Sequence, residues 1–101
     1  PLIKIASNTS WKLYAVINEA ETKLIGSLKL LIPNQSIDYS SIKPEGQYLS
    51  LEPKLIAAGD KTVDENSYWI DVSCSLLIDD FTKVRAGTID IPIDFYLEQL
   101  D

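Results

Sequence analysis

The chain has 101 residues, of which 46% are hydrophobic, enough for one domain with one core and too few for two. Its net charge of -6, with Arg85 as the only arginine, argues against nucleic acid or an anionic membrane surface as a partner, because both require a basic face. The lack of histidine excludes Ser-His-Asp and Cys-His catalysis and histidine metal ligation, and no run reaches the roughly 20 apolar residues of a membrane span. We therefore expect residues 1–101 to form a single domain without direct membrane insertion.

The first third of the chain predicts strands. Leu2 to Ala6 forms a short strand, and residues 11–17 alternate between apolar and polar side chains with a period of two. Four apolar residues share one face of this second segment: Trp11, Leu13, Ala15 and Ile17. Lys23 to Ile32 alternates in the same way, so the two segments are expected to form a hairpin through the turn at 18–22.

A helix within residues 11–31 is the alternative. Several apolar side chains also fall at helical spacing there: Leu13, Val16, Ile17, Ala20, Leu24, Leu28 and Leu31. Gly26 inside the segment, β-branched and aromatic residues at both ends and no capping-box Glu or Gln after Ser10 favour the two strands. A helix at this place would make the fold α+β instead of all-β.

The middle of the chain continues the β pattern. Gln47 to Leu51 alternates, and residues 53–59 form either a strand or one helical turn ended by Gly59. Ser67 to Ile78 predicts the longest strand. Its apolar face is expected to hold Tyr68, Ile70, Val72, Cys74, Leu76 and Ile78, and its other face Trp69, Asp71, Ser73 and Ser75.

The chain closes on the most regular alternation, from Thr88 to Leu97. This pattern predicts a last strand whose core-lining side chains are Ile89, Ile91, Ile93, Phe95 and Leu97. Pro92 cannot donate a ladder hydrogen bond, which indicates a sheet edge, and outward Asp90 and Asp94 would make that edge a poor site for strand addition. About seven short strands separated by turns predict an antiparallel β-sandwich of immunoglobulin-like type.

Two carboxylate arrangements suggest chemistry. Calcium prefers six to eight oxygen ligands, and five acidic residues in two predicted links are candidates: Asp60, Asp64, Glu65, Asp79 and Asp80. Their spacing matches no calcium-loop motif, so a solvated connection is the expected role. Paired carboxylates could also hydrolyse glycosides, but the acids are scattered over loops and outward faces. We expect no enzyme, no metal and no cofactor.

Outward aromatic side chains are the main candidates for binding. Trp69 lies on the polar face of its predicted strand, as Tyr14 and Tyr96 do on theirs. Such residues can anchor a protein partner or stack on sugar rings, and the alternative is packing under a loop or beside a cross-strand neighbour.

Three further positions carry reactive or modifiable groups. Cys74, the single cysteine, cannot form a disulfide within the chain and is expected to be an inert buried thiol. Asn8-Thr9-Ser10 and Asn34-Gln35-Ser36 match the acceptor pattern for N-glycosylation and fall in predicted turns.

Ser7-Asn8-Thr9-Ser10-Trp11-Lys12-Leu13-Tyr14 and Ala86-Gly87-Thr88-Ile89-Asp90-Ile91 resemble the first hairpin and last strand of bacterial cell-surface and fimbria-type β-sandwich modules. The resemblance implies a non-enzymatic structural or protein-interaction module, extracellular or on the cell surface, with a protein partner or neighbouring module and no cofactor. This chain lacks the cysteine pair of many fimbrial subunits and shows no obvious detached donor strand. A carbohydrate-binding module that uses Trp69 with Tyr14 or Tyr96 is the alternative.

Overall fold

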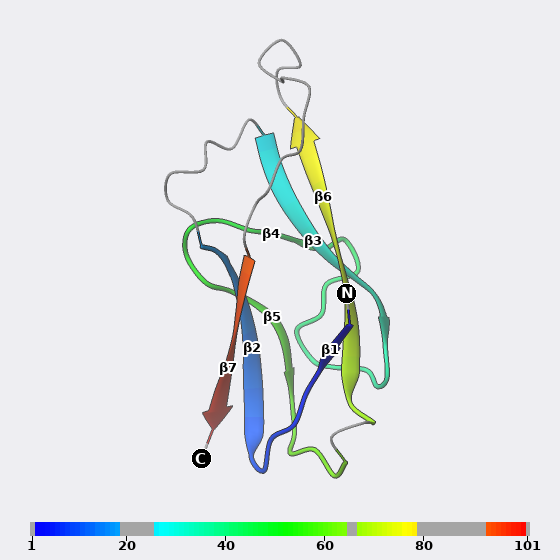
Figure 1. Cartoon of the computed structure of the whole chain (residues 1–101). Coiled ribbons are helices and arrows are strands. Elements are labelled where there is room, and N and C mark those ends of the chain that lie inside the picture. Colours follow the sequence, from blue (N-terminus) through cyan, green and yellow to red (C-terminus); the bar gives the residue numbers. More distant parts are fainter. Residues whose placement is uncertain (1, 19–25, 65–66, 79–92, 101) are drawn as a thin grey trace.

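The computed structural model describes residues 2–18, 26–64, 67–78 and 93–100, and these ranges hold strands and connections but no helix (Figure 1). The strands are β1 (Leu2–Lys4), β2 (Ser10–Ile17), β3 (Gly26–Gln35), β4 (Gln47–Tyr48), β5 (Lys54–Gly59), β6 (Trp69–Ile78) and β7 (Ile93–Leu100). The all-β prediction is confirmed, and the helix considered for residues 11–31 is wrong, because the described parts of that segment belong to β2 and β3. Residues 54–59 form a strand and not a helical turn.

The strands form two antiparallel sheets that pack as a β-sandwich. One sheet has the order β1-β6-β3-β4 and the other the order β5-β2-β7. The described ranges thus hold seven strands in sheets of four and three, the strand count of an immunoglobulin-like sandwich. Figure 1 shows the two sheets side by side, with β2, β5 and β7 in one layer and β1, β3 and β6 in the other.

The predicted hairpin between residues 11–17 and 23–32 is wrong. Both segments are strands, but β2 pairs with β5 and β7 while β3 pairs with β4 and β6. The two strands therefore lie in opposite sheets. Alternation shows that each strand has an apolar face, but two such faces can meet across a sandwich as well as lie beside each other in one sheet.

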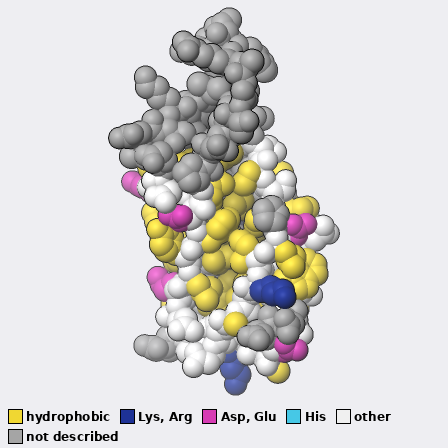
Figure 2. Space-filling view, in the orientation of Figure 1, with side chains coloured by type: hydrophobic (Ala, Val, Ile, Leu, Met, Phe, Trp, Pro, Cys, Tyr) yellow, Lys and Arg dark blue, Asp and Glu magenta, His cyan; other side chains and the backbone are white. Residues whose placement is uncertain are grey.

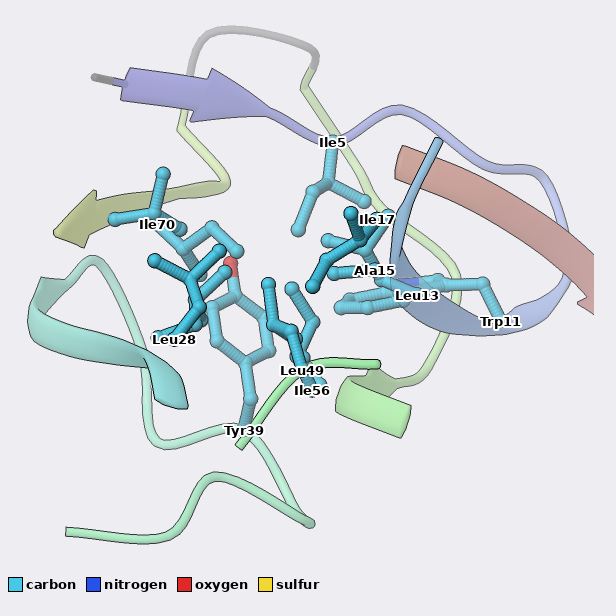
Figure 3. Close-up of a cluster of buried hydrophobic side chains, with 13 residues drawn as sticks. Ile5, Trp11, Leu13, Ala15, Ile17, Leu28, Tyr39, Leu49, Ile56 and Ile70 are labelled. Atoms are coloured by element: carbon cyan, nitrogen blue, oxygen red, sulfur yellow. The ribbon is translucent and has the colours of Figure 1, made fainter. Parts of the chain in front are cut away.

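The core lies between the sheets and contains the apolar faces predicted for the early strands. Trp11, Leu13, Ala15 and Ile17 are all buried, and Leu28 and Leu30 of β3 face them from the other sheet. Tyr39 joins this core from a connection, with its ring 5.4 Å from that of Trp11 in an edge-to-face arrangement. Figure 3 shows the labelled side chains converging from both layers.

The longest predicted strand is confirmed as β6, with one correction at its centre. Ile70 and Val72 are buried, as expected for the core-facing set. Cys74 lies on the same face, because it pairs with buried Leu30 of β3, yet Cys74 is exposed. The prediction of a buried thiol is therefore wrong, although the predicted direction of the side chain is right.

For the closing strand, too, the predicted direction of the side chains is right and their predicted burial is wrong. β7 lies at the edge of its sheet, as predicted, and pairs along its whole length with β2. Ile93, Phe95 and Leu97 pair with buried Ile17, Ala15 and Leu13, so they point toward the core. Phe95 and Leu97 nevertheless remain 36% and 41% exposed. Asp90 and Pro92, which were predicted to protect this edge, fall outside the described residues.

A membrane-crossing helix is not found in any of the ranges that the structure describes.

Candidate interaction surface

The outer edge of β6 is paired over only part of its length by the described residues. β1 pairs with β6 over three residues, from Lys4 opposite Trp69 to Leu2 opposite Asp71. β6 continues to Ile78, and no described strand pairs with its outer edge beyond Asp71.

β7 is an edge strand of the other sheet. Gln99 Nε2 of β7 donates a hydrogen bond to Ser7 Oγ at 3.2 Å, and Ser7 lies in the connection that follows β1. On the other side of the sandwich, β5 lies next to β3 and β4. One small cavity between them is lined by residues that include Leu30, Gln47, Leu55 and Ile56. The end of β7 at Gln99 thus lies close to the connection after β1, while Phe95 and Leu97 earlier in β7 are exposed.

We call this region the open side and define it by the inward-pointing side chains Cys74, Phe95 and Leu97, together with the edge of β7 and the edge of β6 beyond Asp71, which no described strand pairs. Figure 2 shows a band of hydrophobic side chains between β2 and β7 on one side and β1 and β6 on the other. Folded monomers seldom leave core-facing side chains uncovered, and contiguous apolar surface of this kind marks contact sites. Unpaired strand edges add rows of backbone donors and acceptors to it.

The opposite side of the sandwich is partly covered. The amide of Ala58 in β5 donates a hydrogen bond to the carbonyl of Ser40 at 3.2 Å, and Ser40 Oγ donates to the carbonyl of Ala58 at 3.2 Å. The connection after β3 therefore covers the edge of β5 at Ala58. A cavity of about 10 Å³ and a wider depression of about 330 Å³ lie on this side and share five lining residues: Ser41, Ile42, Lys43, Gln47 and Leu55.

At the lower end of the open side, three hydrogen bonds join Ser7 and Thr62, and we call this pair the clasp. The amide of Ser7 donates to Thr62 Oγ1 at 2.9 Å, Thr62 Oγ1 donates to the Ser7 carbonyl at 3.2 Å, and the Thr62 amide donates to the same carbonyl at 2.8 Å. Ser7 is itself buried. These bonds fix the chain where it crosses from one sheet to the other, so the opening ends there.

Cys74 gives the open side its one nucleophilic group among the described residues. Partial burial raises the pKa of the thiol, because desolvation disfavours the thiolate. The group is thus accessible but not activated. Phe95 and Leu97, which point toward the core from β7, add exposed apolar side chains to the open side.

The structure separates the three aromatic residues that the sequence proposed for binding. Tyr14 and Tyr96 lie directly opposite each other in the β2–β7 register, on the outer face of the three-stranded sheet. Trp69 lies on β6, on the outer face of the other sheet, and is half-buried. The two tyrosines form one surface, and the tryptophan is on the far side of the sandwich from them.

The tyrosine surface includes a shallow depression of about 250 Å³ lined by Tyr14, Pro53, Tyr96, Leu97 and Glu98. The Tyr96 hydroxyl donates to Asp94 Oδ2 at 3.5 Å. Carbohydrate sites, like many other sites for small polar ligands, combine aromatic side chains with a nearby carboxylate in this way.

The acidic candidates for calcium are only partly described. Asp60 and Asp64 are exposed, while Glu65, Asp79 and Asp80 lie outside the described residues. Asp60 Oδ1 accepts a hydrogen bond from Ser10 Oγ at 3.4 Å, and Asp64 Oδ2 accepts one from Ser67 Oγ at 3.2 Å. In the part of the chain that can be assessed, no group of three acidic or sulfur ligands gathers around one point.

The two glycosylation-type sites fall in different environments. Asn8 is exposed in the bend between β1 and β2, as the turn prediction requires. Asn34 is exposed but belongs to β3, where it pairs with Asp71 beyond a register shift that follows Leu31. The predicted turn at 33–36 is therefore in part a strand end.

Sequence reasoning missed the open side. The alternation placed Cys74, Phe95 and Leu97 toward the core, but whether an inward side chain is buried depends on the residues that the opposite sheet places against it. Searches with family models, against curated proteins and against solved structures found no match to this chain.

Proposed function

We propose that this chain is a non-enzymatic protein-interaction module and that the open side is its contact surface. The observation that carries the proposal is the exposure of Phe95 and Leu97, two side chains that point toward the core from a strand at a sheet edge. A partner that packs against Phe95 and Leu97 would bury them. The edges of β6 and β7 that no described strand pairs can supply backbone groups to the same partner.

A peptide-display selection tests this proposal. Peptides selected on the wild-type chain are measured by fluorescence polarisation against a double variant, Phe95→Ser with Leu97→Ser, and a control, Tyr48→Ser with Leu51→Ser. Tyr48 and Leu51 are 52% and 56% exposed, and Tyr48 is on β4, at the other edge of the four-stranded sheet from β1. We expect the selected peptides to lose at least about tenfold in affinity, roughly 1.4 kcal/mol, for the first variant only. Equal binding to both variants would refute the proposal.

The tyrosine surface supports a second candidate function, which is carbohydrate binding. Tyr14 and Tyr96 are neighbours, and Glu98 at the margin of the depression can accept hydrogen bonds from sugar hydroxyls. A glycan array followed by affinity gels tests it, with Tyr14→Ala and Tyr96→Ala as the variants and Trp69→Ala as the control. Loss of glycan binding in the tyrosine variants alone would favour this function over the first.

A bacterial surface or secreted setting for the module remains a prediction. Its support is the resemblance of the two ends of the chain to modules of that kind. Localisation of an epitope-tagged full-length gene product tests it directly, and retention in the cytosol would contradict it.

A further inference from the structure

We infer that the wider depression between β4 and β5 is a binding site for a small organic carboxylate with an apolar body. This depression lies on the side of the sandwich opposite to the open side, so the inference is independent of the proposed function. The depression has a volume of about 330 Å³ and is lined by five residues: Ser41, Ile42, Lys43, Gln47 and Leu55. All five belong to residues 26–64, which the structure describes without a gap.

The floor of the depression is apolar and comes from both sheets. The adjoining cavity of about 10 Å³ shares the five lining residues and adds Leu30 and Ile32 of β3 and Ile56 of β5. Leu30 and Ile56 are buried in the core, and Ile32 and Ile42 pack against it. A ligand with an apolar body would cover side chains at the margin of the core, which is favourable because it removes apolar surface from water.

A tight turn forms the wall of the depression that carries Lys43 and Gln47. The amide of Gly46 donates a hydrogen bond to the carbonyl of Lys43 at 2.9 Å, and Gly46 has a φ of 86°. A Cβ atom at Gly46 would lie 2.7 Å from Leu31 Cδ2, so only glycine lets the turn approach β3 this closely. The backbone of this wall is therefore in place before a ligand binds, which lowers the entropic cost of binding.

The polar side chains that line the depression can all donate hydrogen bonds. Lys43 contributes an ammonium group, Gln47 an amide and Ser41 a hydroxyl, and no carboxylate is among the lining residues. None of these three side chains has a hydrogen bond or an ion pair in the described structure. Glu45, in the same turn, is exposed and does not line the depression. Donors beside an apolar floor match a carboxylate with an apolar body better than a neutral or a cationic ligand.

Hexanoate is the probe, with hexanamide and hexylamine as neutral and cationic compounds of the same chain length. Titrations followed by amide NMR give the dissociation constant and the location of binding together. We expect hexanoate to cause saturable shifts at the amides of residues 41–47 and 55–56. Hexanamide should bind about two- to fivefold more weakly, the value of one partly exposed ion pair, and hexylamine more weakly still.

The apolar body and the source of the carboxylate are tested with two further compounds. Acetate should bind at least about tenfold more weakly than hexanoate, because it lacks the methylene groups that cover the floor. Acetyl-leucine mimics the carboxyl end of a peptide. The order of its affinity and that of hexanoate separates a peptide end from a free acid as the natural ligand.

Substitution of the ammonium group tests the site itself. Lys43→Gln should weaken hexanoate binding about two- to fivefold and leave hexanamide binding unchanged, whereas Lys43→Arg keeps the charge and should retain most of the affinity. Lys61→Gln is the matched control, because Lys61 is also an exposed lysine but lines a different depression. Both lysines are exposed, so the fold should tolerate these changes.

Several results would overturn the inference. One is equal affinity for hexanoate and hexanamide, and another is an equal loss of hexanoate affinity in Lys43→Gln and Lys61→Gln. Shifts confined to amides outside residues 41–47 and 55–56, or shifts that do not saturate, would also exclude a site between β4 and β5. None of these results bears on the open side, because its test uses different variants and different ligands.

Discussion

Ala15 and Phe95 lie directly opposite each other on β2 and β7 and point to the same side of their sheet, yet Ala15 is fully buried and Phe95 is 36% exposed. The two side chains differ in their place in the sheet. Ala15 is on the central strand and belongs to the core cluster, whereas Phe95 is on the edge strand and lies outside that cluster. This contrast between paired residues defines the open side, and it leads to a direct test by substitution.

Leu13→Ala and Leu97→Ala should have unequal effects although the two leucines are partners in the β2–β7 ladder. Leu13 is 4% exposed, so its truncation leaves a cavity and should lower the free energy of unfolding by about 2–5 kcal/mol. Leu97 is 41% exposed, and its truncation should cost about 1 kcal/mol. Urea denaturation followed by tryptophan fluorescence measures both. Equal losses would mean that Leu97 is covered in solution.

Gly59→Ala should destabilise the core at Trp11. A Cβ atom at Gly59 would lie 2.8 Å from Cζ2 of Trp11, whose side chain is 1% exposed and whose Nε1 donates to the carbonyl of Asp60 at 2.9 Å. The indole cannot move without losing that hydrogen bond, so we expect a loss of about 1–3 kcal/mol. Asp60→Ala is the control, because it keeps the carbonyl and changes an exposed side chain. A loss for Gly59→Ala no larger than for the control would contradict the packing described.

Thr62→Val should weaken the clasp at the lower end of the open side. The substitution keeps the shape of the side chain but removes the hydroxyl that bonds both the amide and the carbonyl of Ser7. The unpaired amide of Ser7 should cost about 1–3 kcal/mol in thermal or urea unfolding. The neighbouring reverse substitution, Val63→Thr, is the matched control, since Val63 is 86% exposed and should tolerate the change within about 0.5 kcal/mol.

The Cys74 thiol should make stability depend on pH in the alkaline range. Burial raises the pKa of this thiol in the folded chain, so the unfolded chain loses the proton at a lower pH than the folded chain does. Stability from this group is complete below the ordinary cysteine pKa of about 8.5 and is lost as pH rises above it.

The measurement for Cys74 is the difference in unfolding free energy between the wild type and Cys74→Ser from pH 7 to 10, which cancels the other groups that titrate there. The wild type should lose more stability than the variant as pH rises. In the same range, Cys74 should react with a disulfide reagent more slowly in the folded chain than in urea, and a faster reaction when folded would show an activated thiol instead.

The faces of the strands were predictable because alternation is local. Trp11, Leu13, Ala15 and Ile17 are buried as a set, and Ile70 and Val72 are buried on β6, since successive side chains of a strand must point to opposite sides. The direction of Phe95 and of Cys74 followed from the same rule and is correct. The edge position of β7 also agreed with the position of Pro92 in the sequence, although Pro92 itself lies outside the described residues.

Pairing and exposure were decided by the tertiary structure. β2 and β3 follow one another in sequence but lie in opposite sheets, and Tyr14 and Tyr96 meet while Trp69 lies on the far side. Which strand lies beside which depends on contacts between residues far apart in the chain, so a periodic pattern cannot specify it. The sequence alone thus determined which side chains point inward. Only the tertiary structure decided that Cys74, Phe95 and Leu97 stay exposed although they point inward.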